Sequence, residues 1–454
     1  MPVLPLFLRL ACASTGLALL ASTALAQDTT RVDQLVQSQV EAGQFSGTVL
    51  IGRDGQIIFE RGYGLANREW NMPNDGQTKF RLGSVTKQFT AASILLLTEQ
   101  GKLRLDDPVS PHIVDAPASW DGITLRHLLS HTSGIPNFTN FPDFFALNNQ
   151  PATLDSLITR FRNKPLEFTP GTAFNYSNSG YVLLTAVIEK VSGQSYEAFV
   201  TEQIFQPLGL SQTGYDRHET ILPHRASGYT PSEGGMKNAR YADMSIPVGA
   251  GALYSTVHDL MKWNEALFGG KLLKADSVAL MTTPVMNGSA LGLFIRYENG
   301  KPILWHNGRI EGFNTYLAWD PETRTSIVVL GNMNGSGPDA IGNQLTTLVQ
   351  GGNMVLPHER TRVILSPQEL EDYVGEYALA PNFNLTIRVS DGKLQAQATG
   401  QSATDLAAEA RDHFFLTAID AQLHFTRDDK GLVNGLVLHQ AGRQMPASRL
   451  PQLR

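Results

Sequence analysis

The chain has little cysteine, little excess charge of either sign and few long apolar runs, and each shortage excludes a class of protein. Its 454 residues include one cysteine, Cys12, so an internal disulfide or a thiolate metal cluster is excluded. The formal net charge is −6 and no run of Lys or Arg occurs, which argues against nucleic acid or an anionic membrane surface as a partner. Hydrophobic residues make up 42% and charged residues 17%, which is typical of a globular protein with a large core. A small molecule or a peptide is the expected partner.

Several catalytic motifs are also absent. The sequence has no Gly-x-Ser-x-Gly elbow, which argues against a hydrolase of the α/β-hydrolase type. It has no His-Glu-x-x-His zinc motif and no phosphate-binding loop, and Gly62-Tyr63-Gly64 lacks the third glycine of a dinucleotide-binding turn. The chemistry therefore has to come from ordinary side chains, with no metal and no cofactor.

The one long apolar run lies at the N-terminus. Arg9 precedes an apolar or small-residue stretch from Leu10 to Ala26, and Ala24-Leu25-Ala26 has the form of a cleavage site. We expect residues 1–26 to be a signal peptide, so that the mature protein is exported to the periplasm or secreted, without a stable membrane span. An uncleaved membrane anchor is the alternative, because the run is close to the length that crosses a bilayer.

The rest of the chain predicts strands at both ends of a helical region. Asp54-Gly55 suits a tight hairpin turn, and Val85 to Gln100 is apolar on nearly every face, which favours a buried helix. Helices interrupted by Pro and Gly are predicted as far as about Leu291. The predicted strands are Thr48–Ile51, Ile57–Phe59, Ile303–His306, Thr315–Trp319 and Thr325–Leu330. The pattern favours an α/β domain over residues 27–356, in which one sheet combines distant parts of the chain.

A second, smaller domain follows a polar linker at residues 357–364. Alternation of apolar and polar residues from Leu385 to Val389 and from Leu394 to Ala398, around the turn Asp391-Gly392, predicts short antiparallel strands. We expect residues 365–454 to form a small all-β, barrel-like domain.

Ser84 and Lys87 are the first candidates for chemistry. Ser84 lies at the predicted start of the buried helix, where free backbone N–H groups favour negative charge. Residues three apart share a helix face, so the Lys87 amine lies beside the Ser84 hydroxyl, and a desolvated lysine can serve as a base. The spacing alone is weak evidence, since Ser390 and Lys393 repeat it in a predicted hairpin turn.

Two further polar clusters support this pair. Tyr176-Ser177-Asn178 offers a phenol that can relay protons and an amide that can orient lysine or substrate. His306-Asn307-Gly308 is predicted at the end of a strand, where glycine would allow close approach of a substrate. The backbone N–H of Arg309 could then complete an oxyanion hole with that of Ser84.

These three motifs, in this order, resemble the serine β-lactamase and penicillin-binding protein superfamily. The resemblance covers roughly residues 38–334, and within it the chain is most similar to the branch of class C β-lactamases, D-Ala-D-Ala carboxypeptidases, D-aminopeptidases and esterases. It implies a β-lactamase/transpeptidase-like fold and an acylated Ser84, with Lys87 and Tyr176 handling protons and Asn178 contacting the substrate amide. The tail resembles the lipocalin-like domain sometimes appended to this branch.

One departure from the family pattern bears on the substrate. β-Lactamases of this branch usually carry Lys where this chain has His306, and a neutral histidine is a weaker anchor for an anion. We therefore expect a serine hydrolase that cleaves an ester or a peptide. A β-lactamase and a non-catalytic penicillin-binding or sensor module are the alternatives. The general base, Lys87 or Tyr176, and the oligomeric state are left open.

Overall fold

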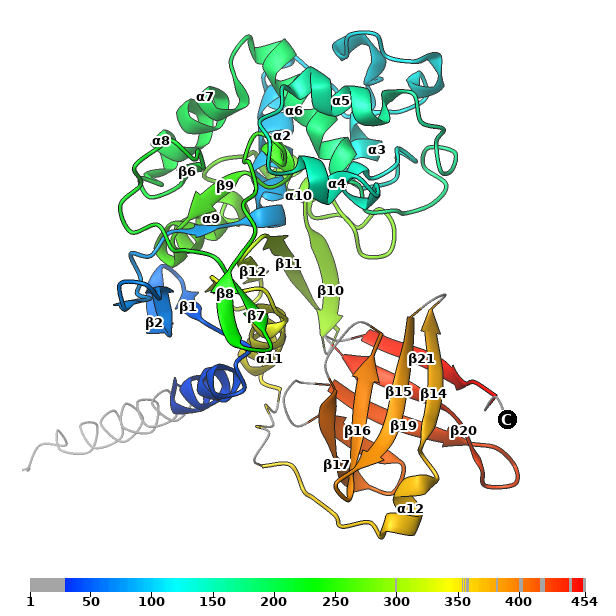
Figure 1. The fold of residues 1–454 in the computed structure, drawn as a ribbon. Helices are drawn as coiled ribbons and strands as arrows, with labels where there is room; N and C mark the ends of the chain where they lie inside the picture. The colour runs from blue at the N-terminus through cyan, green and yellow to red at the C-terminus, as the bar shows by residue number, and fades with distance from the viewer. Residues whose placement is uncertain are drawn as a thin grey trace, which may run out of the picture.

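The computed structural model describes residues 29–451 apart from 299, 353, 355, 357–358, 381–382, 400–402, 417–420 and 441–442. The expected signal peptide and its cleavage site lie outside the described residues. A helix over residues 29–41 opens the described chain. The chain then forms a sheet flanked by helices, a helical region and a separate barrel (Figure 1).

An antiparallel six-stranded sheet forms the centre of the larger domain. Its order is β10-β11-β12-β13-β1-β2, so strands from both ends of the domain pair with one another, as the sequence predicts. The hairpin between β1 and β2 turns at Asp54 and Gly55, whose φ angles are 48° and 77°. The strands are β1 (Gly47–Arg53), β2 (Gln56–Tyr63), β10 (Phe294–Glu298), β11 (Lys301–Ile310), β12 (Phe313–Asp320) and β13 (Thr325–Gly331).

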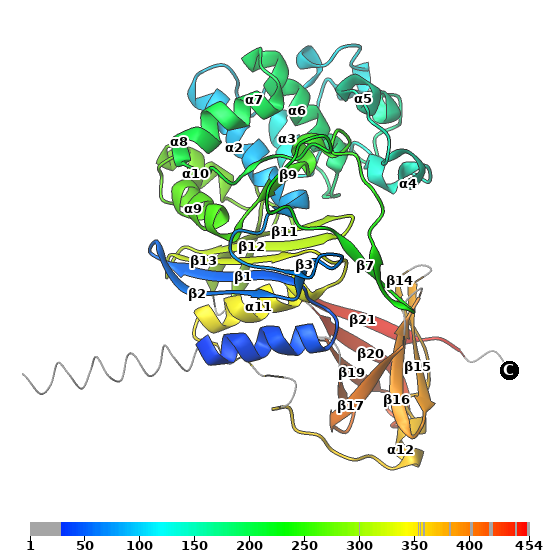
Figure 2. The ribbon, with the colours of Figure 1, turned by 60° about the vertical axis from the view of Figure 1, so that its left-hand side comes forward.

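Each face of the sheet packs against its own helices. Along β1, Leu50 points into the core shared with the helical region, whereas Val49 and Ile51 point into the opposite core. The second core is closed by the helix at residues 29–41 and by α11 (Gly337–Val349), which lie together under the sheet in Figure 2. The sheet is therefore the middle of three layers, which is how an amphipathic helix on either side buries its apolar stripe.

The helical region is organised around α2 (Thr86–Glu99), which follows a short 3-10 turn, η1 (Gly83–Val85). Most of α2 is buried, as its apolar sequence predicts. Its Phe89 ring stacks on the ring of Trp263, with the ring centres 3.9 Å apart. The other helices are α3 (Leu125–Leu129), α4 (Phe144–Leu147), α5 (Leu154–Arg162), α6 (Asn178–Ser192), α7 (Tyr196–Val200), α8 (Gln206–Leu208), α9 (Val257–Phe268) and α10 (Ala275–Met281). Short strands join them: β3 (Leu65–Asn67), β4 (Met72–Pro73), β5 (Phe80–Arg81), β6 (Gly214–Tyr215), β7 (Tyr229–Ser232), β8 (Gly235–Asn238) and β9 (Leu253–Ser255).

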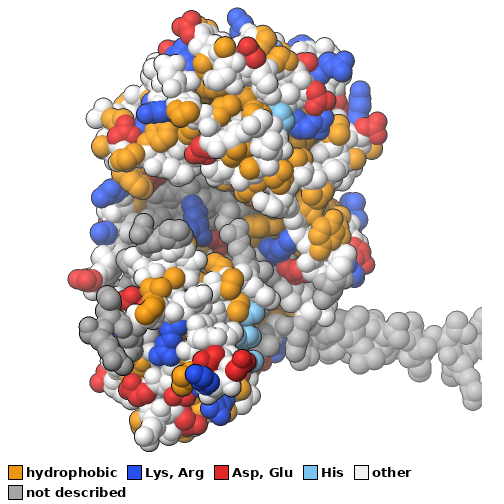
Figure 3. Space-filling model, turned by 90° about the vertical axis from the view of Figure 1, so that its right-hand side faces the viewer, with side chains coloured by type: hydrophobic (Ala, Val, Ile, Leu, Met, Phe, Trp, Pro, Cys, Tyr) orange, Lys and Arg blue, Asp and Glu red, His pale blue; other side chains and the backbone are white. Residues whose placement is uncertain are grey.

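The C-terminal domain is a closed eight-stranded antiparallel barrel, which confirms the all-β prediction. It begins with α12 (Pro367–Glu371), where Ser366 and Glu369 form a reciprocal capping box. The strands are β14 (Gly375–Ala380), β15 (Phe383–Ser390), β16 (Lys393–Ala398), β17 (Thr404–Ala410), β18 (His413–Leu416), β19 (Ala421–Arg427), β20 (Val433–Gln440) and β21 (Arg443–Arg449). Figure 3 shows the barrel beneath the larger domain, with a hollow where the two meet. Among the residues described, no helix has the length and apolarity needed to cross a bilayer.

Candidate active site

The structure places Ser84 in η1, directly before α2 and against strand β11. Gly83 has a φ of 54°, a conformation that favours glycine, and a Cβ atom there would lie 2.8 Å from the backbone nitrogen of Arg309. The turn that carries Ser84 therefore lies in close contact with the strand that carries Arg309. Ser84 itself lines a cavity of about 1200 Å³ that opens beside it, which we call the active-site cavity.

Lys87 is fully buried on the first turn of α2. Its Nζ atom lies 3.1 Å from Ser84 Oγ, 2.8 Å from Asn178 Oδ1 and 2.8 Å from the carbonyl oxygen of Ala250. Burial away from water lowers the pKa of Lys87 well below its ordinary value. The amide and carbonyl oxygens can only accept, so they take the two hydrogens of a neutral amine. The remaining lone pair then faces the Ser84 hydroxyl.

Tyr176 lies next to this pair, in the loop that precedes α6. The Lys87 Nζ atom is 4.9 Å from the centre of the Tyr176 ring. Burial raises the pKa of Tyr176 above its ordinary value, and a hydrogen bond with Ser84 opposes that shift only in part. The phenol is therefore protonated near neutral pH, in reach of the Ser84 hydroxyl.

His131 fixes the position of this tyrosine. Its ring stacks on that of Tyr176 with the centroids 4.2 Å apart, and its Nδ1 atom accepts a hydrogen bond from the backbone N–H of Ser177 at 3.1 Å. Ser177 caps α6, which begins at Asn178, four residues before its continuous apolar run starts at Val182. The apolar run reveals only the interior of that helix, whereas its cap is polar.

Asn178 is held by hydrogen bonds from both sides. Its Oδ1 atom accepts from Lys87, its Nδ2 atom donates to Thr139 Oγ1 at 3.1 Å, and its backbone N–H donates to Asn137 Oδ1 at 3.1 Å. The amide orientation is therefore fixed by its surroundings. Asn178 also lines the active-site cavity, which allows the same amide to meet a substrate.

His306 lies in the middle of a strand, which corrects the sequence-based expectation of a strand end. Strand β11 continues to Ile310, because its pairing with β12 persists as far as Phe313. The His306 Nδ1 atom lies 2.5 Å from the carbonyl oxygen of Asn307. Burial lowers the pKa of His306 to about 3. The side chain is therefore neutral.

Gly308 and Arg309 continue the same strand past Ser84. A Cβ atom on Gly308 would lie 1.9 Å from the carbonyl oxygen of Leu82, so only glycine lets β11 approach this closely. The pairing of β10 with β11 ends at Trp305, and the described strands leave that edge open beside Arg309. The Arg309 guanidinium forms an ion pair with Asp339 at 2.9 Å.

The comparisons with known proteins agree with this geometry. The family model described as Beta-lactamase matches residues 32–350, which is more than half of the chain. The chain belongs to the Beta-lactamase family. A second model, described as a domain of unknown function, DUF3471, matches residues 359–449 and so covers the barrel.

The proteins to which this chain is similar include penicillin-binding proteins and an amidohydrolase. Penicillin-binding protein 4* of Bacillus subtilis (strain 168) is 28% identical, over 91% of this chain and 97% of that protein. The octameric penicillin-binding protein homologue from Pyrococcus abyssi is 25% identical with a TM-score of 0.68, over 92% and 99% of the two chains. A D-stereospecific amidohydrolase from Streptomyces sp. is 28% identical with a TM-score of 0.58, over 67% and 94%.

The structure brings all seven predicted site residues of this Beta-lactamase family member to one place, and it adds residues that sequence analysis missed. The Ala250 carbonyl, which holds Lys87, has no side-chain signal at all. Asp339 pairs with Arg309 and also accepts from Asn307 Nδ2 at 2.8 Å. It lies in α11, a helix that the sequence analysis did not predict. Within the described chain, no group of His, Cys, Asp and Glu side chains is arranged to hold a metal ion.

Proposed function

We propose that the protein is a serine hydrolase that forms an acyl-enzyme on Ser84 and cleaves an ester or amide bond. The observation that carries this proposal is the hydrogen-bonding pattern of Lys87. Its buried Nζ atom lies 2.8 Å from each of two oxygens that can only accept and 3.1 Å from Ser84 Oγ. A neutral amine that donates to both oxygens directs its lone pair at the Ser84 hydroxyl. That arrangement activates a serine nucleophile at a pH where an exposed lysine would be protonated.

The reaction follows from the positions of the groups. Lys87 takes the proton of Ser84 as Oγ bonds to the substrate carbonyl carbon, and the negative oxygen binds the backbone N–H groups of Ser84 and Arg309. Tyr176 passes a proton to the leaving group as the bond from carbon to the leaving nitrogen or oxygen breaks. Water then attacks the ester on Ser84 by the same route and releases the acid. His306, being neutral and buried, packs beside Tyr176, with the ring centres 6.2 Å apart, and supplies no charge.

Ester or peptide cleavage is favoured over β-lactam hydrolysis by the charges at the site. The pKa of about 3 leaves His306 uncharged at neutral pH, and the cation of Arg309 is already paired with Asp339. Among the described residues that line the cavity, Arg296 is likewise paired with Glu298, so both guanidinium groups are weak anchors for the carboxylate of a penicillin. A β-lactamase, or a penicillin-binding module without turnover, remains the alternative. The N-terminal 26 residues support export as the setting of the reaction.

Substitution of the nucleophile tests the proposal. We expect Ser84→Ala to abolish turnover of a p-nitrophenyl acyl ester, whereas Ser390→Ala should retain full activity. Ser390 is a matched control because it begins the second Ser-x-x-Lys pattern, at the end of β15 in the barrel. Equal turnover by wild type and Ser84→Ala would refute the assignment.

Intact-mass measurement after incubation with penicillin separates the alternatives. Absence of an adduct, together with ester turnover, supports the esterase or peptidase. Rapid formation and release of penicilloic acid supports a β-lactamase. A lasting adduct on Ser84 without ester turnover supports the penicillin-binding module.

A further inference from the structure

The charged side chains that line the active-site cavity carry more negative than positive charge. Two guanidinium groups line it, and each is already paired: Arg296 with Glu298 at 2.8 Å and Arg309 with Asp339 at 2.9 Å. Two further carboxylates, Asp243 and Glu311, line the same cavity. Neither forms an ion pair with any described residue. The cavity that contains Ser84 therefore carries two uncompensated negative charges.

Glu311 lies in the turn that directly follows β11, two residues beyond Arg309. The side chain is half-buried, and its Oε1 atom accepts a hydrogen bond from Asn148 Nδ2 at 2.6 Å. A neutral amide donor orients the carboxylate but does not cancel its charge. The carboxylate is thus held in place on the wall of the cavity.

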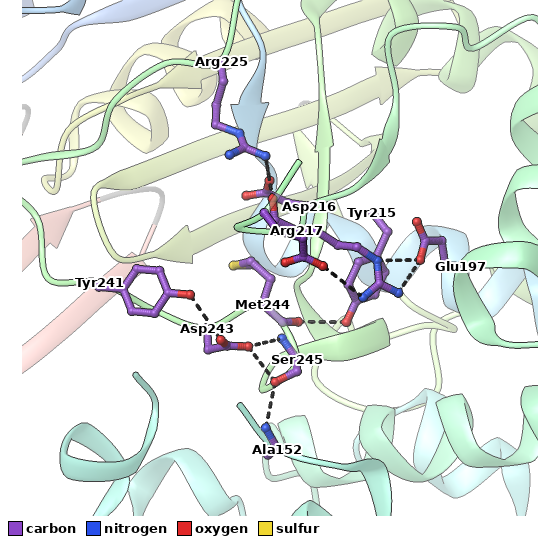
Figure 4. A network of polar contacts seen from close by, with 11 residues as sticks. Ala152, Glu197, Tyr215, Asp216, Arg217, Arg225, Tyr241, Asp243, Met244 and Ser245 are labelled. Carbon is purple, nitrogen blue, oxygen red and sulfur yellow. Dashed lines mark hydrogen bonds and ion pairs between the residues drawn. The ribbon is translucent and has the colours of Figure 1, made fainter. Parts of the chain in front are cut away.

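Asp243 is hydrogen-bonded to the same asparagine that holds Glu311. Its backbone N–H donates to the Asn148 carbonyl oxygen at 2.9 Å. Its carboxylate accepts from Ser245 Oγ at 2.6 Å and from the Tyr241 hydroxyl at 3.1 Å, as Figure 4 shows. Partial burial raises the pKa of Asp243, but these hydrogen bonds outweigh it and leave the pKa below its ordinary value.

An aromatic surface completes this wall. Phe138, Phe144 and Phe145 line the same cavity, and Phe145 is 62% exposed. The exposed Arg240 lies 6.0 Å from the Phe145 ring centre and does not line the cavity. Ring faces and carboxylates both attract a cation, and the rings also bury apolar groups.

We infer that the active-site cavity selects substrates that carry a protonated amine next to an apolar or aromatic group, with Glu311 and Asp243 as specificity-determining residues. The chemical class is that of amino-acid amides and esters, or peptides, with a free amino group. This inference rests on the proposed function, because it concerns the substrate of the Ser84 reaction. It also implies poor binding of substrates whose amine is acylated.

The test compares a free amine with its acylated form. The substrates are phenylalanine p-nitroanilide, in its D and L forms, and the N-acetyl derivative of each. We expect wild type to cleave the D or the L free-amine substrate with a kcat/KM at least tenfold above that of its own N-acetyl derivative. In Glu311→Gln, which can still accept from Asn148, and in Asp243→Asn, that preference should fall at least tenfold, with N-acetyl turnover within twofold of wild type.

A matched control removes the same charge elsewhere. Asp429 is exposed in the barrel, so Asp429→Asn should leave the preference unchanged. Retained turnover of a p-nitrophenyl ester by each variant shows that it is folded and that Ser84 still reacts. Turnover of that ester by wild type with no preference for the free amine overturns the inference alone. If wild type turns over none of these substrates in a Ser84-dependent way, the proposed function is overturned as well.

Discussion

At the scale of the single residue, the site depends on one buried lysine whose pKa lies well below that of an exposed lysine. Removing a charged amine from water costs several kcal/mol, so full burial lowers the pKa of Lys87 unless a counter-ion is present. Its three described partners are a hydroxyl, an amide oxygen and a backbone carbonyl, and none of these is anionic. The pattern Ser-x-x-Lys indicates the pair, but it cannot indicate this environment, since Ser390 and Lys393 share the pattern in an exposed hairpin.

The pH dependence of activity should report Lys87. Its amine is the base only when unprotonated, so kcat/KM should rise as the pH passes upward through the lowered pKa and stay level above it. Tyr176 adds no falling limb below pH 10, because burial raises its pKa. Lys87→Arg, which stays protonated, should lose at least about 100-fold in kcat. Stopped or continuous assays from pH 5 to 10 measure both effects.

His306→Gln provides the comparison for that profile. With a pKa of about 3, His306 stays neutral across the range, so the substitution should change the rate without moving the acidic limb. Disappearance of the limb in His306→Gln would identify the histidine, not Lys87, as the base.

At the scale of the element, the sequence predicts strands and the buried helix well and predicts their ends poorly. The hairpin at Asp54-Gly55 and the helix α2 follow directly from turn chemistry and apolar pattern. Strand β11 was expected to end at His306, because the polar residue and the glycine that follow it usually mark a loop. Its partner β12 supplies hydrogen bonds through Ile310, and this tertiary pairing outweighs local propensity. Asp339 was missed for the same reason, since only the packed helix α11 brings it to Arg309.

Gly308→Ala tests the close contact between β11 and the turn that carries Ser84. The added Cβ atom would lie 1.9 Å from the Leu82 carbonyl oxygen and 2.4 Å from Thr315 Oγ1, so the strand must move. We expect the loss of one oxyanion contact to lower kcat about 100-fold, and the overpacking to cost about 1–3 kcal/mol. Esterase kinetics and thermal unfolding measure the two effects.

Gly122→Ala is the matched control for this substitution. A Cβ atom on Gly122 would meet nothing within 4 Å, and we expect wild-type kinetics and an unchanged unfolding temperature. A Gly308→Ala enzyme with wild-type kcat would show that the contact of β11 with Leu82 does not set the position of Arg309.

At the scale of the whole molecule, the barrel contributes to the cavity that contains Ser84. Thr404 at the start of β17 and Met445 in β21 line that cavity together with residues of the larger domain. Along β17, Thr404 shares a strand face with Leu406 and Ala408, which lie in the barrel core. One end of the barrel interior therefore faces the cavity. Sequence analysis predicts the barrel from its alternation, but no local pattern indicates where a second domain docks.

This placement predicts that the barrel limits the length of the substrate. Thr404→Trp should fill that end of the cavity and lower kcat/KM at least fivefold for p-nitrophenyl esters of long acyl chains or for longer peptides. Turnover of p-nitrophenyl acetate should stay within twofold, because the short ester does not reach the barrel. Thr426→Trp is the control, since Thr426 is exposed on β19 and does not line the cavity. An equal loss on short and long substrates in Thr404→Trp would contradict a role in length selection. It would indicate instead that the barrel acts on the chemistry at Ser84 itself.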